Sequence, residues 1–263
     1  MSDNVALTRN GVIATVTLNR PEAMNALTRE LYADLEGAFR DANRNPEVRC
    51  VIVTGEGRAF CSGDDVKQLM LGEQRDATQQ RLRDVRPRPT PAAVAILECD
   101  KPVIAAVNGP AVGWGMELSL FCDIRIASDR AKFGELFIKR GLVADVGGLW
   151  RLPHVVGQSK AAELLFTGDV IDAHEAERIG LVSRVVSHDE LMTAARDLAA
   201  KIAANPPIAM RYMKEGLRVG ARGDLHDTGA FVGSSLAYLF TTDDHREGAL
   251  SFVERREPVF EGR

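Results

Sequence analysis

Two turns in this chain carry glycines at places where the backbone could bind a ligand. The first turn is residues 58–66 (RAFCSGDDV) and the second is residues 108–117 (NGPAVGWGME); each follows a short apolar run and precedes a helical pattern. Gly63 permits a backbone conformation that other residues avoid, and the glycines flanking Trp114 permit close approach to a ligand. Unpaired N–H groups at the start of a helix favour negative charge. Together the turns predict an oxyanion hole, because one oxyanion needs two convergent N–H donors.

Each turn alone also has an ordinary interpretation. The first could be a helix-entry loop capped by an aspartate. The second could be a dinucleotide-binding turn, but that motif is GxGxxG, and residues 113–118 (GWGMEL) lack the third glycine. A Rossmann oxidoreductase is therefore only a distant alternative. The serine-hydrolase motif GxSxG is absent from the sequence.

The elements around the turns follow an α/β pattern. Residues 5–8 and 12–18 flank Asn10-Gly11 and predict a β-hairpin, and Thr28 is expected to cap a helix that runs to Asn43. Short apolar runs predict buried strands at 50–55, 102–108 and 124–127, with another extended piece at 131–134. Residues 72–90 are charged and predict a solvated helix or, alternatively, a flexible wall over a binding site.

The last third of the chain is mostly helical. Helical spacing predominates from residue 159 onward and is interrupted only at 181–186. The pattern predicts an α/β core over residues 1–200 and a C-terminal helical region over residues 201–263. We expect this region to bury an apolar face by oligomerisation.

The composition limits the possible function classes. The 263 residues are 45% apolar, enough for a full core, and 33 Lys and Arg are scattered against 37 Asp and Glu, so no nucleic-acid-binding surface is indicated. The four cysteines form no CxxC pair and are expected to be buried thiols, and the five histidines show no metal-ligand spacing, so no metal site is predicted. Neither a leader pattern nor a membrane span is visible, which favours a cytoplasmic protein without a membrane partner.

Several further segments occur in the order typical of the enoyl-CoA hydratase/isomerase (crotonase) family. They are residues 18–21 (LNRP), 25–27 (NAL), 101–109 (KPVIAAVNG), 122–125 (CDIR), 180–182 (GLV) and 252–254 (FVE). The chain therefore resembles this family over nearly its whole length. The resemblance implies a crotonase-like spiral of ββα units with a helical C-terminal trimerisation region, assembled as a homotrimer or dimer of trimers. It also implies an acyl-CoA thioester as substrate, with no separate cofactor.

The resemblance assigns roles to individual residues. It implies that the backbone N–H groups of Asp64 and Trp114 bind the oxyanion, and that their side chains are not the functional part. It places CoA along Ala23, Met24, Ala26, Ala59, Asp65 and Val66, with Phe252 and Arg255 approaching the nucleotide. For Arg255, an exposed charge on a helix is an equally good interpretation.

The acid and base distinguish hydration from isomerisation. Glu117 occupies the place of the first catalytic glutamate of the family's hydratases, but the second, twenty residues further on, is replaced by Phe137 in the expected acyl pocket. Phe137 can neither accept nor donate a proton. Glu135 is close in sequence and could substitute for that glutamate, but a two-residue offset need not aim it into the pocket, and a surface or salt-bridged position is the favoured interpretation.

Residues 141–153 (GLVADVGGLWRLP) offer a different carboxylate. The segment resembles the dienoyl-CoA isomerase branch, in which the aspartate faces the acyl chain; a helix N-cap is the structural alternative for Asp145. We therefore expect double-bond isomerisation with Glu117 and Asp145 as acid/base candidates. Hydration of a trans-2-enoyl-CoA and a catalytically silent CoA-ester-binding subunit are the alternatives.

Overall fold

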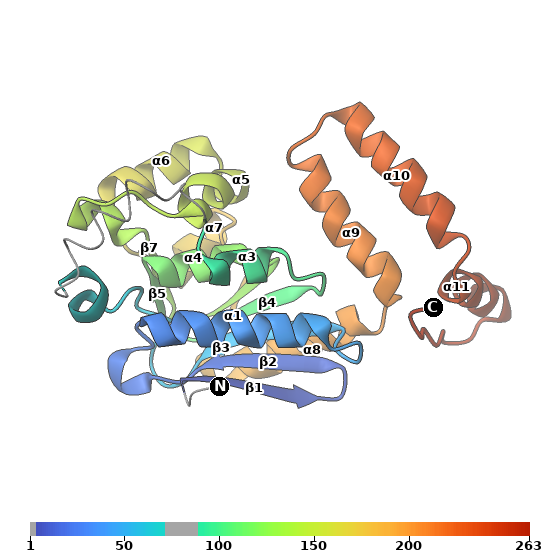
Figure 1. Ribbon diagram of the computed structural model, residues 1–263, viewed down its shortest axis with the longest axis horizontal. Helices are drawn as coiled ribbons and strands as arrows, with labels where there is room; N and C mark the ends of the chain where they lie inside the picture. Colours follow the sequence, from blue (N-terminus) through green and yellow to red (C-terminus); the bar gives the residue numbers. More distant parts are fainter. Residues whose placement is uncertain (1–3, 72–88) are drawn as a thin grey trace.

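The computed structural model describes residues 4–71 and 89–263 and contains two sheets (Figure 1). The large sheet has the order β1-β2-β3-β4-β6-β9 and the small one the order β5-β7-β8. The strands are β1(Val5–Asn10), β2(Ile13–Leu18), β3(Cys50–Gly55), β4(Val103–Val107), β5(Pro110–Val112), β6(Ile124–Ser128), β7(Lys132–Gly134), β8(Ile171–Asp172) and β9(Arg184–Val186). The predicted hairpin is β1-β2, and the rest of the large sheet is parallel.

The central strand β3 is buried on both faces. Val51 and Val53 belong to one core with the buried residues of α1(Arg29–Arg44), whereas Cys50 and Ile52 belong to a second core with α8(Leu191–Ala203). Successive side chains of a strand point to opposite faces, so this short apolar run joins both cores. The side chain of Thr28 caps α1 by accepting the N–H of Leu31, as predicted.

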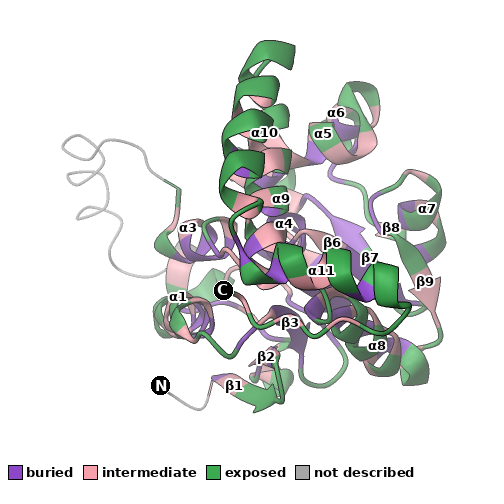
Figure 2. Ribbon diagram, turned by 90° about the vertical axis from the view of Figure 1, so that its right-hand side faces the viewer, coloured by how far each residue is buried: buried purple, intermediate pink, exposed green. Residues whose placement is uncertain are grey.

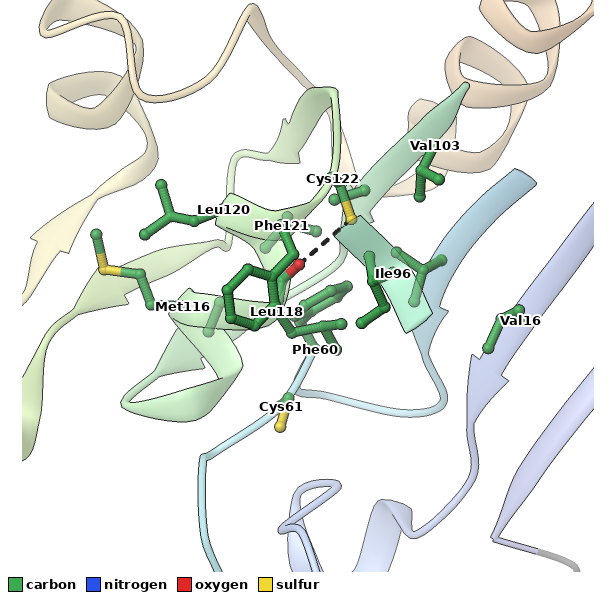
Figure 3. Packing of buried hydrophobic residues seen from close by; sticks show 14 of the residues in the cluster. Val16, Phe60, Cys61, Ile96, Val103, Met116, Leu118, Leu120, Phe121 and Cys122 are labelled. Carbon is green, nitrogen blue, oxygen red and sulfur yellow. Dashed lines mark hydrogen bonds between the residues drawn. The ribbon is translucent and has the colours of Figure 1, made fainter. Parts of the chain in front are cut away.

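Helix α4(Trp114–Phe121) lies wholly inside the first core. All eight of its residues are buried. Figure 3 shows Leu118 and Phe121 close to Phe60, which lies in the first turn, and Met116 belongs to the same cluster. The second turn therefore leads directly into the interior of the protein.

Further helices complete the core. They are α3(Pro91–Leu97), α5(Leu152–Val156), α6(Gln158–Thr167) and α7(Ala173–Arg178), with short π-helical segments at Val66–Met70 and Gly147–Arg151. The short strands β5 and β8 and helix α3 were not predicted, because runs of two to seven residues have little periodicity. The helix expected over 72–90 lies almost wholly outside the described residues.

The last three helices project beyond one end of the sheet (Figure 1). They are α9(Pro207–Gly220), α10(Leu225–Leu239) and α11(Asp243–Glu254). Lys214 ties α9 to Asp123 with an Nζ–Oδ2 distance of 2.7 Å, whereas α10 and α11 are mostly exposed (Figure 2). The predicted boundary at residue 200 falls inside α8, and the connection between α8 and α9 follows Ala203.

Candidate active site

The two glycine-bearing turns lie against each other. The N–H groups of Phe60 and Cys61 donate to the carbonyl of Pro110, and the N–H of Val112 donates to the carbonyl of Cys61. Gly63 has φ +83°, and a Cβ built on it would lie 2.8 Å from the carbonyl oxygen of Val112. Turns separated by about 50 residues in sequence are therefore joined by backbone contacts that leave no room for a side chain at Gly63.

Both predicted oxyanion donors border one pocket. It has a volume of about 50 Å³ and is lined by Ser62, Gly63, Asp64, Val66, Gly113, Trp114, Leu136, Phe137 and Arg140. The backbone N–H groups of Asp64 and Trp114 donate no hydrogen bond to any described residue. Gly113 precedes Trp114 with φ +54° and opens α4, so the N–H of Trp114 lies at a helix N-terminus. This pair has the chemistry required for an oxyanion hole.

The first turn is held from outside by residues 25–27. The N–H of Leu27 donates to the carbonyl of Gly63, and the N–H of Asp65 donates back to Leu27, so the peptides on both sides of Asp64 are fixed. The buried Asn25 amide donates to the carbonyls of Glu56, Ala59 and Phe60. Met24 and Asn25 both have positive φ, so the backbone that carries this amide is in the left-handed region.

Glu117 lies one helical turn after Trp114 and is fully buried. Its Oε2 accepts the N–H of Gly148 at 3.0 Å, while its Oε1 has no hydrogen-bond partner among the described residues. Burial raises the pKa of Glu117 to about 8, and the Asp145 charge adds to the shift. A Cβ on Gly147 would lie 2.1 Å from Oε2, so this glycine makes the space that the carboxyl occupies. Glu117 can therefore hold a proton near neutral pH.

Asp145 is tied to the second turn. Its Oδ2 accepts the indole Nε1–H of Trp114 at 3.1 Å, and its Oδ1 accepts the N–H of Val146 at 2.7 Å. Asp145 directly precedes the helical segment that begins at Val146, and its carbonyl accepts the N–H of Leu149, but its side chain bonds Val146 and makes no cap hydrogen bond further into that segment. The indole of Trp114 holds this carboxylate in place.

Glu135 is the main departure from the expected surface position. It is only 1% exposed, and neither of its carboxyl oxygens has a hydrogen-bond partner among the described residues. Burial, reinforced by the charges of Glu117 and Asp145, raises its pKa well above the ordinary value. The surface or salt-bridged interpretation is therefore wrong, since Glu135 is a second buried carboxyl, beside Glu117, and the charges of Glu117 and Asp145 both act on it.

Phe137 lines the pocket beside both turns and is half-buried. The side chain of Asp64 is also bound: its Oδ1 accepts the hydroxyl of Tyr32 at 2.6 Å. With the Trp114–Asp145 bond, this contact shows that the side chains of both predicted donors make specific contacts inside the site.

Most of the predicted CoA-binding residues gather at the first turn. The N–H of Ser62 donates to the carbonyl of Met24, the guanidinium of Arg20 donates to the carbonyl of Ala26, and the same guanidinium lies 3.7 Å from Asp65. Ala59 and Val66 lie in and directly after this turn. Phe252 lies in α11 and Arg255 caps that helix, which projects beyond the end of the sheet in Figure 1, and Phe252 is 85% exposed. Within one chain they do not reach the other predicted CoA contacts.

Three residues of the site were not predicted from the sequence. Tyr32 pairs with a residue 32 positions away, and Glu135 is buried by tertiary packing, so neither carries a local signal. Asn25 stands in the NAL segment, and its buried amide could have been suspected only from that motif.

Across residues 4–71 and 89–263, no group of three or more His, Cys, Asp or Glu side chains could hold a metal ion. The described helices include none that is long and apolar enough to cross a membrane. All four cysteines are buried free thiols, as predicted.

Known proteins resemble this chain over its full length. The enoyl-CoA hydratase/isomerase family profile matches residues 8–263. A short-chain-enoyl-CoA hydratase of Clostridium acetobutylicum is 36% identical over 97% of this chain and 96% of its own length. An (E)-benzylidenesuccinyl-CoA hydratase of Thauera aromatica is 39% identical over 98% of this chain and 99% of its own length. The crystal structure of an enoyl-CoA hydratase from Bacillus anthracis superposes with a TM-score of 0.91, 34% identity and coverage of 99% and 100%. The chain therefore belongs to the enoyl-CoA hydratase/isomerase family and has the crotonase fold.

Proposed function

We propose that this enzyme shifts a carbon–carbon double bond in an enoyl- or dienoyl-CoA thioester. The thioester oxygen would accept the N–H groups of Asp64 and Trp114, which have no acceptor among the described residues. The observation that carries the proposal is the pocket wall at residue 137, which is a phenyl ring where hydration would need a second carboxyl. No water is consumed in an isomerisation, so a single acid/base pair is sufficient.

Glu117 and Asp145 would move the proton. One carboxylate removes a proton from an allylic carbon, the electrons shift into a dienolate held by the two amides, and a carboxylic acid returns a proton at the other end of the allylic system. The raised pKa of Glu117 favours its role as the acid near neutral pH, with Asp145 as the base. The indole Nε1–H of Trp114 would orient Asp145 toward the thioester that the same residue binds.

Hydration of a trans-2-enoyl-CoA is the second candidate. Two observations favour it: the relatives at 36% and 39% identity are named hydratases, and Glu135 is a buried carboxyl without a partner among the described residues. A water molecule between Glu117 and Glu135 would make the phenyl ring at 137 irrelevant to hydration.

Product mass in heavy water distinguishes these reactions. The enzyme would be incubated in D2O with crotonyl-CoA, a 3-enoyl-CoA and a dienoyl-CoA, and the thioesters analysed by mass spectrometry. Isomerisation keeps the formula and adds deuterium, whereas hydration adds one water. A product that is mainly hydrated would contradict isomerisation and support hydration as the function. If the thioesters bind but are neither converted nor labelled with deuterium, the alternative of a catalytically silent CoA-ester-binding subunit is supported.

We further propose that the chain acts as a trimer or dimer of trimers with CoA as part of its substrate. The last three helices expose large apolar side chains, including Leu217 at 76% and Val253 at 77%. A neighbouring copy could bring Phe252 and Arg255 to the CoA held along Ala23 and Met24. Light scattering that finds a stable monomer at micromolar concentration would contradict the assembly, and calorimetry without saturable heat from CoA would contradict the binding.

A further inference from the structure

Tyr32 lies between the two turns and contacts the side chains of both. It belongs to the first turn of α1, where its own N–H donates to the carbonyl of Thr28. Its hydroxyl donates to Oδ1 of Asp64 at 2.6 Å. Its ring meets the indole of Trp114 edge-on, with 4.8 Å between ring centroids and an interplanar angle of 82°. Edge-to-face contact is one of the two preferred geometries of an aromatic pair.

The contacts continue to the acid/base pair. From the indole of Trp114, the Nε1–H donates to Asp145, so a continuous chain of contacts runs from Asp64 through Tyr32 and Trp114 to Asp145. The two residues whose amides face the pocket are thus connected through their side chains as well as through their backbones. The carboxylates of Asp64 and Asp145 lie at the two ends of this series of contacts.

We propose that Tyr32 is a positioning residue that couples the oxyanion donor of Asp64 to the donor of Trp114 and to the carboxylate of Asp145. This inference rests on the proposed function but does not depend on whether the reaction is isomerisation or hydration, because both need the same oxyanion hole. Tyr32 is not among the residues that line the pocket, and it acts through Asp64, which its hydroxyl contacts, and Trp114, which its ring contacts.

The backbone at Asp64, which Tyr32 contacts, is held less firmly by packing than helix α4 is. Asp64 is half-buried, and its neighbours on the first turn are fixed by hydrogen bonds to Leu27 rather than by a buried helix. Removal of one hydrogen bond at such a place lets an amide swing away from its target, and a displacement of about 1 Å can reduce a rate about 100-fold. We therefore expect the Tyr32 hydroxyl to affect kcat more than KM.

A spectroscopic experiment tests the coupling without any substrate. The chain has two tryptophans, so 5-fluorotryptophan labelling gives two fluorine resonances, and Trp150→Phe assigns the one from Trp114. Asp64→Asn should move the Trp114 resonance in the parent, because the change passes through Tyr32. In the Tyr32→Leu background the same substitution should leave that resonance in place. An equal shift in both backgrounds would overturn the proposal.

A kinetic cycle tests the consequence for the reaction. Tyr32→Phe keeps the ring on Trp114 and removes the hydroxyl, and we expect kcat to fall roughly 10- to 100-fold with KM changed less than about threefold. In an Asp64→Ala background, Tyr32→Phe should have no further effect, because the acceptor of its hydroxyl is gone. A purely structural role would instead lower the melting temperature and give the same fold-loss in both backgrounds, which would overturn the proposal.

Failure of this inference and failure of the proposed function are distinguishable. A parent enzyme that converts no CoA thioester contradicts the proposed function, and the fluorine experiment still decides the coupling. A parent that is active, with Tyr32→Phe equally active, contradicts only the role of Tyr32. Tyr212→Phe is the matched control: that tyrosine packs on Phe231 and Tyr238 in the C-terminal helices, and its loss should leave kcat unchanged.

Discussion

The two turns of the site are held in different ways. The turn before Trp114 leads into a helix whose eight residues are all buried, and its Gly113 N–H donates to the carbonyl of Gly134. Asp64 itself is half-buried, and the backbone and side chain around it are fixed by polar contacts from Leu27, Asn25 and Tyr32. One donor is therefore positioned by close packing and the other by hydrogen bonds. The first should be sensitive to added volume, and the second to a lost polar partner.

Added volume in the packed turn should have the largest effect. A Cβ on Gly115 would lie 2.0 Å from the carbonyl oxygen of Cys61, a backbone atom that cannot move alone. We expect Gly115→Ala to cost roughly 3 kcal/mol or more of stability, together with nearly all activity. Urea unfolding measures the loss of stability. Gly233→Ala is the control, because a Cβ at Gly233 would have no atom of the described residues within 4 Å. Equal stability of the two variants would show that the second turn is not held by packing.

Removal of either proposed proton carrier should have the next largest effect. Glu117→Gln and Asp145→Asn each keep the shape of the side chain but cannot shuttle a proton, and we expect rates to fall on the order of 100- to 10,000-fold. Both variants should fold and bind CoA, which circular dichroism and calorimetry check. If Asp145→Asn keeps most of the activity on dienoyl and 3-enoyl thioesters while Glu117→Gln loses it, the two-carboxylate mechanism is wrong and Glu117 acts alone.

The apolar pocket wall at Phe137 can be replaced by a polar side chain. Phe137→Glu places a carboxyl beside both turns, and we expect crotonyl-CoA hydration to rise above that of the parent, by about 10-fold or more. The natural control is Phe137→Leu, which removes the ring without adding an acid. A hydration rate no better than the parent's would count against the position assigned to residue 137.

The smallest expected effect is on the pH dependence of stability. Burial raises the pKa of Glu117 to about 8 from the ordinary 4.5, so the folded protein keeps a proton that the unfolded chain releases between these values. The parent therefore loses stability as pH rises from about 4.5 to 8, and Glu117→Gln escapes this loss. We expect the melting-temperature advantage of Glu117→Gln to widen by at least about 2–4 °C between pH 5 and pH 8, the shift that ~1 kcal/mol produces at this size. A constant difference would contradict the raised pKa.

The sequence predicted the parts of the molecule that have local signals. The β1-β2 hairpin, the Thr28 cap and the fully apolar strand β3 follow from turn residues, capping and hydrophobic runs, and the two glycine turns follow from their place between strand and helix. Contacts between distant residues could not be predicted in this way. The Tyr32–Asp64 bond and the burial of Glu135 depend on how elements pack, and a two-residue offset in sequence did not prevent Glu135 from being buried.

The enclosed Glu117 carboxyl also makes ligand binding a proton-linked equilibrium. An acyl group placed against this carboxyl, or a carbonyl charge brought near it, changes its affinity for a proton. The buffer must then supply or take up the protons that the carboxyl gains or loses. The heat measured on binding a CoA thioester at pH 8 should then depend on the ionisation enthalpy of the buffer, and the slope counts the protons exchanged. Glu117→Gln should make the same titration independent of the buffer, so the calorimeter can read the state of this side chain before any bond is broken.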